Sequence, residues 1–137
     1  MKRILLVLAV GLGLAPSIFA AQLPPAPAGT FSIAVIPDTQ HYKGQKTKAE
    51  PNSTKALTNP VFKAYTSWIA DNLKSQRIVF VSHVGDIVDI NNRAQWTIAR
   101  RHMDRLHGQV PYGISVGNHD MTGAGDSSLF QEFFPAK

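Results

Sequence analysis

The feature that most constrains this chain is an apolar run that ends abruptly in a glycine and two carboxylates, Ile-Val-Phe-Val-Ser-His-Val-Gly-Asp-Ile-Val-Asp over residues 78–89. A run of this kind is typical of a strand buried inside a parallel sheet. Asp86 then follows the carboxyl end of the strand, where open α/β sheets bind their ligands. Gly85 permits a sharp turn that would aim this carboxylate into a cleft. A surface turn with two solvated aspartates is the alternative interpretation.

The first twenty residues have the features of a secretory signal peptide. Lys2 and Arg3 precede an apolar run over residues 4–14, and small residues follow at Ala20 and Ala21. The run is short for a membrane span, so we expect cleavage and no membrane attachment afterwards, with a helical anchor as the alternative. The chain contains no cysteine, which excludes a disulfide framework and a thiolate metal site. We therefore expect a periplasmic or secreted protein.

The remaining residues divide into a Pro/Ala-rich linker over 21–29 and one α/β domain over 30–137. Runs of β-forming residues predict strands over 31–36, from residue 78, and over 110–116. Amphipathic patterns predict helices from Asn59-Pro60 to residue 73, from Asn91 or Asn92 to about residue 107, and over 126–134. The order strand-helix-strand-helix-strand predicts a parallel sheet.

Apolar residues at helical spacing predict the faces that pack on the sheet. The first helix should bury Val61, Phe62, Tyr65, Trp68, Ile69 and Leu73, so we expect Trp68 in the core. The second helix should bury Trp96, Ala99, Met103 and Leu106 and end at Gly108.

The charge of the chain permits attraction of anionic substrates and is weak evidence for a nucleic-acid binder. The formal net charge of +5 falls to +3 without Lys2 and Arg3, leaving 12 basic and 9 acidic residues. That excess is modest for a nucleic-acid binder. The polar segment 42–58 carries four lysines, at positions 43, 46, 48 and 55. We expect an irregular loop whose lysines are solvated or steer phosphate toward a nearby site.

Each predicted strand runs into a loop with polar, oxygen-bearing side chains. The loops are Asp38-Thr39-Gln40, residues 85–89 and Gly117-Asn118-His119-Asp120. In a parallel sheet they would meet at one edge, and their oxygen and nitrogen donors suit Mn, Fe or Zn ions. A carboxylate on the middle strand could bridge two ions, which would hold a phosphate and lower the pKa of a bound water.

The histidine of the third loop has a possible role beside such ions. His119 could donate a proton or a hydrogen bond to developing charge. Asp120, its neighbour in sequence, could orient that imidazole. His83 is more readily explained as a buried, hydrogen-bonded strand histidine than as a ligand.

These three motifs, in this order and each after a strand, resemble the first three motifs of the calcineurin-like metallophosphoesterases: Asp-x-His/Gln, Gly-Asp-x-x-Asp and Gly-Asn-His-Asp/Glu. The first motif resembles that of a secreted bacterial branch of the family, in which glutamine replaces the usual histidine. The resemblance implies the N-terminal half of that family's layered sheet and helix sandwich, covering residues 31–120. It implies that Asp38 and Gln40 bind the first ion, Asp86 bridges, and Asn118 binds the second ion and the phosphate. It also implies that His119 protonates the leaving group. Asp89 would lie next to the metal ligands without binding an ion itself.

One departure from the family pattern limits the functional expectation. The family completes its site with later histidines, and histidines 41, 83, 102 and 107 do not stand in those motifs. We therefore expect the N-terminal part of a longer enzyme that hydrolyses phosphate mono- or diesters, with little activity from this chain alone. The alternatives are a non-catalytic binding module that retains the half-fold and, more weakly, a nucleic-acid binder.

Overall fold

Three short parallel strands form the centre of the fold, and the computed structural model describes residues 23–135. The strands are β1 (Ser32–Ile36), β2 (Ile78–His83) and β3 (Tyr112–Ile114), and they hydrogen-bond in the order β1-β2-β3. Both strand pairs are parallel. The predicted α/β class and the order of its elements are confirmed.

The strands end level with one another at their carboxyl ends. His83, the last residue of β2, is in register with Ile36, the last of β1, and with Ile114, the last of β3. The loops that follow the three strands therefore leave from the same edge of the sheet. This alignment is what brings the three sequence motifs to one side of the molecule.

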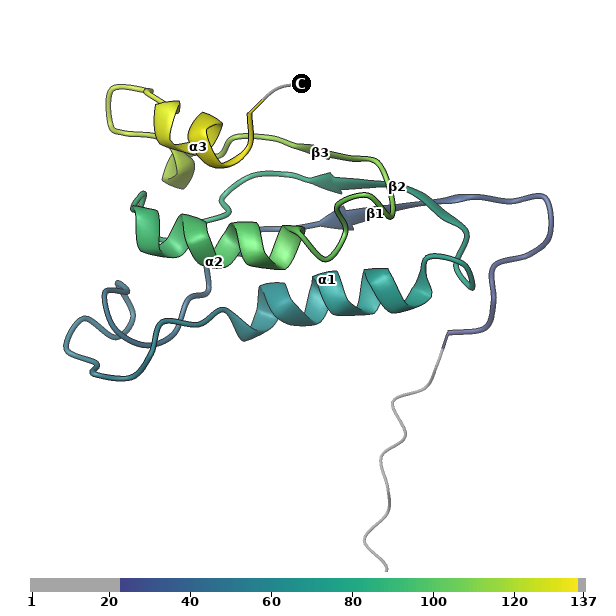
Figure 1. Cartoon of the computed structure of the whole chain (residues 1–137), viewed down its shortest axis with the longest axis horizontal. Helices are drawn as coiled ribbons and strands as arrows, with labels where there is room; N and C mark the ends of the chain where they lie inside the picture. Colours follow the sequence, from purple (N-terminus) through teal and green to yellow (C-terminus); the bar gives the residue numbers. More distant parts are fainter. Residues whose placement is uncertain (1–22, 136–137) are drawn as a thin grey trace, which may run out of the picture.

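Two helices cover one face of the sheet (Figure 1). Helix α1 (Pro60–Asn72) begins at Asn59, whose side-chain oxygen accepts the Phe62 N–H at 3.0 Å. Helix α2 (Arg93–Met103) begins in the same way at Asn92. Capping side chains of this kind satisfy backbone donors that a helix leaves free at its start. A 3-10 turn, η1 (Asn118–Asp120), and a short helix, α3 (Ser128–Phe133), follow β3.

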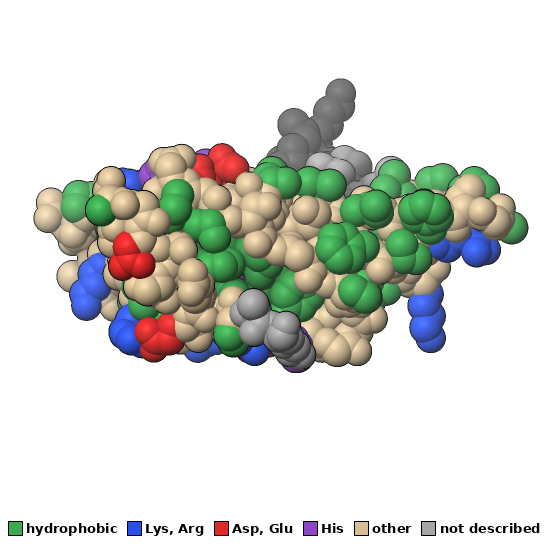
Figure 2. All heavy atoms as spheres, turned by 90° about the horizontal axis from the view of Figure 1, so that it is seen from above, with side chains coloured by type: hydrophobic (Ala, Val, Ile, Leu, Met, Phe, Trp, Pro, Cys, Tyr) green, Lys and Arg blue, Asp and Glu red, His purple; other side chains and the backbone are tan. Residues whose placement is uncertain are grey.

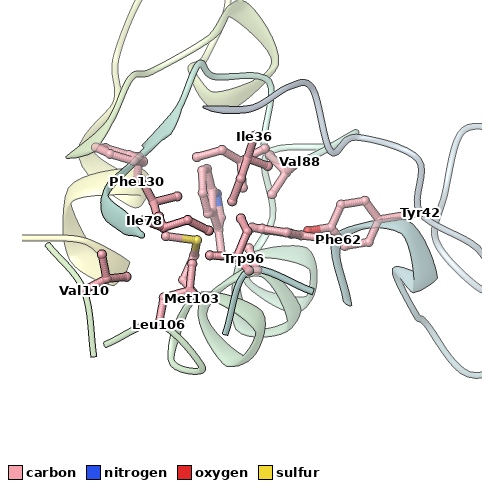
Figure 3. Close-up of a cluster of buried hydrophobic side chains, with 14 residues drawn as sticks. Ile36, Tyr42, Phe62, Ile78, Val88, Trp96, Met103, Leu106, Val110 and Phe130 are labelled. Atoms are coloured by element: carbon pink, nitrogen blue, oxygen red, sulfur yellow. The ribbon is translucent and has the colours of Figure 1, made fainter. Parts of the chain in front are cut away.

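The core lies between the sheet and these helices, around Trp96 of α2 (Figure 3). Trp96 is fully buried, packs against the Phe130 ring at 5.7 Å, and its indole N–H donates to the Asn91 side chain at 2.7 Å. The predicted inner face of the second helix is confirmed, since its four members are buried: Trp96, Ala99, Met103 and Leu106.

The predicted inner face of the first helix was partly wrong. Phe62 and Ile69 are buried, but Tyr65 and Trp68 are 38% and 45% exposed. These two rings line a hollow of about 240 Å³ together with residues 34–37. Thr66 takes a buried place instead, because its hydroxyl is satisfied by the Phe62 carbonyl one turn earlier, at 3.1 Å. The expectation that Trp68 belongs to the core is corrected.

Several boundaries also differ from the predicted ones. Helix α2 ends at Met103 rather than near residue 107, because the chain continues in tighter turns such as Leu106 N–H to the Met103 carbonyl at 2.9 Å. Leu106 is still buried, so the apolar pattern outlasts the helix. Strand β3 is only three residues long, with Pro111 just before it offering its carbonyl but no N–H for pairing.

The opposite face of the sheet is apolar and is not covered by a helix of the described part. Ile33 and Val35 of β1 are 55% and 60% exposed, and Phe80 of β2 is 37% exposed. Hydrophobic side chains gather on the side of the molecule seen in Figure 2. The expectation that β2 is buried on both faces is corrected, since within the described residues only one of its faces is covered.

The described part of the Pro/Ala-rich linker, residues 23–29, lies against the turn before β2. Ala26 N–H donates to the Ser75 carbonyl at 2.8 Å, and the Gln76 side chain donates to the Pro24 carbonyl at 3.1 Å. The predicted signal peptide over 1–20 lies outside the described residues. Within residues 23–135, no helix has the length and apolar character needed to cross a membrane.

The two tryptophans provide a matched test of this core. Trp96→Phe removes buried ring volume and the hydrogen bond to Asn91, so it should lower the free energy of unfolding by about 1–3 kcal/mol. Trp68→Phe, at a half-exposed site, should change it by less than about 0.5 kcal/mol. Urea unfolding followed by circular dichroism measures both; equal losses from the two variants would contradict the assignment of the core.

Candidate functional site

The three motif loops are joined by hydrogen bonds around Asp86. Thr39 N–H, in the first loop, donates to the Asp86 carbonyl at 3.0 Å. His119 N–H, in the third loop, donates to the Asp86 carboxylate at 3.0 Å. The second and third loops also approach closely, because a Cβ on Gly85 would lie 2.8 Å from the Gly117 nitrogen. The structure therefore brings the three loops together with Asp86 in the middle.

Asp86 adopts a backbone conformation that costs energy. Its φ is +51°, in the left-handed region, directly after Gly85 at +103°. A left-handed conformation costs a residue with a side chain roughly 1 kcal/mol or more, and it persists only where surrounding contacts hold it. Backbone strain of this kind clusters at active sites and ligand-binding sites. The contacts that hold Asp86 are consequently part of the site.

Asp120 supplies one set of these contacts. It is fully buried, and its carboxylate accepts the N–H groups of Ile87 and Val88 at 2.9 and 3.1 Å and that of Gly117 at 2.9 Å. Burial raises the pKa of this carboxyl, while the three backbone hydrogen bonds act to lower it. All three contacts are to backbone amides and none to the His119 ring, so the structure offers no contact for the predicted orienting role. Asp120 instead ties the second loop to the third.

His83 and Thr39 supply the second set. His83 is fully buried at the end of β2, with its ring edge-on to Phe62 at 5.3 Å. Its Nδ1 lies 3.2 Å from the Gly85 nitrogen and its Nε2 lies 3.0 Å from the Thr39 hydroxyl. Burial lowers the pKa of His83 to about 4. The prediction of a buried, hydrogen-bonded strand histidine is confirmed.

Three of the four side chains predicted to bind metal make no hydrogen bond in the described part of the chain, and the fourth, Asp86, makes one. Within residues 23–135, no hydrogen bond or ion pair involves the side chains of Asp38, Gln40 or Asn118, and Asp86 uses only one carboxylate oxygen. Asp38 and Asn118 are exposed, and Gln40 and Asp86 are half-buried. We call these four side chains at the sheet edge the rim. They keep oxygen atoms free to bind a ligand, whereas the polar side chains buried behind them are hydrogen-bonded.

The donor set fits divalent ions by chemistry but is incomplete. Two carboxylates and two amides are oxygen donors of the kind that Mg, Mn and Ca prefer. In the part of the chain that the structure describes, no three His, Asp or Glu side chains are grouped so as to hold a metal ion. Two of the four candidates are amides, so the carboxylates Asp38 and Asp86 carry the negative charge of the set.

His119 lies beside Asp89 and Lys48. Its Nδ1 is 3.0 Å from the Asp89 carbonyl and 3.3 Å from the Lys48 ammonium. The Asp89 carboxylate accepts Lys48 N–H at 2.8 Å and lies 3.6 Å from its ammonium. His119 Nε2 has no hydrogen-bond partner within the described residues, so this nitrogen is available to a ligand.

Lys48 shows that the lysine loop is attached to the site. The loop is irregular, as predicted, but the Gln95 side chain also holds it through the Lys46 carbonyl at 3.3 Å. Lys48 is the lysine in this loop that the structure places at the rim, and the sequence offered no signal to separate it from its three neighbours. Thr39 was also missed, although its position between two polar donors within a motif was a usable signal.

The site predicts how stability depends on pH. His83 has a folded pKa of about 4 against an ordinary value of 6.5, so the unfolded chain takes up a proton first as pH falls. The free energy of unfolding should fall between pH 7 and 5, by at most about 2 kcal/mol from this group. Burial and neighbouring cations also lower the pKa of His102.

His83→Gln, which cannot be protonated, should reduce this loss on acidification, and His41→Gln at an exposed position should not. Urea unfolding at the two pH values measures the difference. If His83→Gln loses as much stability on acidification as the unmutated chain, the buried neutral state of His83 is wrong.

Comparisons with known proteins support the fold. No family model matches the chain. "Uncharacterized protein YvnB" of Bacillus subtilis (strain 168) is 35% identical over 102 residues, which are 73% of this chain and 7% of that protein. The structure of purple acid phosphatase PPD1 from yellow lupin (Lupinus luteus) seeds aligns with a TM-score of 0.51 and 20% identity, over 82% of this chain and 21% of the phosphatase. The chain therefore has the fold of part of a phosphatase and spans a small share of both proteins.

Proposed function

We propose that this chain carries the first three motifs of a calcineurin-like metallophosphoesterase that hydrolyses phosphate mono- or diesters. The observation that supports this most is the division of the polar side chains at the sheet edge. Asp120, His83 and Thr39 are buried and hydrogen-bonded, while Asp38 and Asn118 keep their oxygens uncommitted at the rim. The fold shared with part of a plant phosphatase agrees with the proposal.

In this proposal each rim residue has a separate task. Asp38 and Gln40 would hold one metal ion, Asp86 would contribute to both, and Asn118 would hold the second; two such ions would supply an activated water and positive charge for the phosphate. Mn fits the oxygen donors present, and Fe or Zn, the other candidate metals, would need nitrogen ligands from the rest of a longer protein. Asp120 contributes by fixing the backbone on either side of the site.

His119 would act on the leaving group. The Asp89 carbonyl, 3.0 Å from Nδ1, can only accept a hydrogen bond, so Nδ1 would keep its proton there. Nε2 is then the nitrogen from which a ring protonated on both nitrogens would pass a proton to the departing oxygen. The Lys48 ammonium, 58% exposed in its side chain, adds positive charge where an anionic substrate would approach.

Four protein donors are too few to complete the coordination of two ions, which usually take four to six ligands each. We infer that further ligands come from a longer protein, in keeping with the small share of the phosphatase that this chain spans. The isolated 137-residue chain should then bind metal loosely and hydrolyse little. We also infer export, from residues 1–20, and a small phosphorylated substrate rather than a nucleic acid.

A non-catalytic binding module is the second candidate function. The apolar side chains of Ile33, Val35 and Phe80 on the uncovered face of the sheet favour it. A binding module needs no metal, so a titration with Mn²⁺ separates the two functions.

Asp86→Asn tests the metal site directly. The amide keeps the size of the side chain and an acceptor for His119 N–H but removes the negative charge with which Asp86 would hold metal. Calorimetry should show Mn²⁺ binding to the isolated chain weakened at least about tenfold. Asp71→Asn, an exposed change of the same charge on α1, is the control and should bind as the unmutated chain does.

The same pair of variants tests catalysis in the longest open reading frame that contains this chain. Asp86→Asn should lower kcat with an aryl phosphate and Mn²⁺ by about 100-fold or more. Unchanged turnover would end the proposal. Brisk, chelator-sensitive hydrolysis by the 137-residue chain alone would instead contradict the inference that further ligands are needed.

Lys48→Gln tests the role of the lysine loop in the same longer protein. Loss of the ammonium beside His119 should lower kcat/KM by about 3–10-fold, and raised ionic strength should reduce the difference. Lys55→Gln removes an equal charge from the same loop away from the rim and is the matched control. Equal effects of the two variants would show that only net charge matters.

A further inference from the structure

His83 and Thr39 form a hydrogen-bond chain whose direction is determined by its ends. The Gly85 N–H can only donate, so His83 Nδ1, 3.2 Å away, must accept and carries no proton. The neutral ring therefore carries its proton on Nε2 and donates it to the Thr39 hydroxyl at 3.0 Å. The hydroxyl in turn donates to the Ile87 carbonyl at 3.2 Å.

This series of hydrogen bonds begins at Gly85 and ends at Ile87, the two neighbours of the strained residue Asp86. The Asp86 carbonyl between them accepts Thr39 N–H at 3.0 Å. Three consecutive residues of the second loop are thus held by a single buried pair, and the left-handed φ of +51° lies within the part that is held.

Thr39 also holds the first loop in place. It stands between Asp38 and Gln40, and it is fully buried while they reach the rim. The Asn59 side chain, the cap of α1, donates to its carbonyl. Every polar group of Thr39 is therefore used, and each contact fixes the position of a loop rather than the packing of the core.

We propose that His83 and Thr39 are positioning residues of the rim, which hold Asp86 in its left-handed conformation and set Asp38 and Gln40 against it. Both side chains are fully buried, beneath the exposed or half-buried donors. Their effect is on the relative placement of the donors in the first and second loops. The inference deepens the proposed function and rests on it for the identity of the ligand, but the hydrogen-bond chain is testable without any ligand.

Thr39→Val and Thr39→Ser separate the hydroxyl from the shape of the side chain. Valine keeps the volume and loses both hydrogen bonds, while serine keeps the hydroxyl. Thr66→Val is the matched control, because Thr66 is a fully buried threonine whose hydroxyl also donates to a backbone carbonyl, within α1 and away from the rim. It corrects for any general loss of stability.

Two measurements on the 137-residue chain test the proposal. In hydrogen exchange by NMR, Thr39→Val should speed exchange of the Gly85 and Thr39 amides at least tenfold relative to Thr66→Val, and Thr39→Ser should restore it. In calorimetry with Mn²⁺, Thr39→Val should weaken binding about 10–100-fold and Thr39→Ser less than about threefold.

The outcomes distinguish this inference from the proposed function. Unchanged amide exchange in Thr39→Val, or a His83 ring that carries its proton on Nδ1 in ¹⁵N NMR, would overturn the hydrogen-bond chain. Metal binding equal in Thr39→Val and Thr66→Val would overturn the positioning role. A chain that binds no Mn²⁺ at all would count against the proposed function, and the exchange and ring measurements would then decide the inference.

Discussion

The structure of this site depends on holding one aspartate in an unfavourable backbone conformation. Asp86 turns with a φ of +51° at the end of the central strand, which directs it between the loops of the neighbouring strands. Two buried polar groups stabilise that turn: His83 with Thr39 on the side of the first loop, and Asp120 on the side of the third. Because all three are shielded from water, losing any one of these partners would leave a backbone amide or carbonyl unsatisfied, which is costly in a buried place.

The polar residues of the sheet edge fall into two groups with different physical roles. Those behind the rim are buried and spend their hydrogen bonds on the backbone. Asp38 and Asn118 at the rim are exposed, and their side chains have no such partner within residues 23–135. A protein that needed these carboxylates only for solubility would not require a buried scaffold beneath them. Sites that bind charged ligands commonly combine ligand-binding side chains with hydrogen-bonded residues behind them that hold them in position.

Several elements were predictable because local chemistry decides them. Asn59 and Asn92 cap α1 and α2 as expected, and the second helix buries the residues at its predicted spacing. Trp68 was assigned wrongly because helical periodicity identifies an apolar face but not how far the neighbouring sheet extends. Strand β1 lies at the edge of the sheet, and the Trp68 ring remains half-exposed in a hollow beside residues 34–37. The end of α2 was also misplaced, since an apolar pattern continues through tighter turns that bury Leu106 equally well.

By itself the sequence determined the parallel α/β class, the order of the elements and the three loops that carry the candidate side chains. Strand and helix patterns and the position of a loop after a strand are local properties. Only the tertiary structure decided which polar residues are scaffold and which are free. Asp120 and Asn118 stand two positions apart in one motif, yet one is buried on three amides and the other is exposed. The same holds for Lys48, which reaches His119 from a loop 71 residues away in sequence. Such contacts depend on how distant segments pack, and composition and spacing carry no information about that.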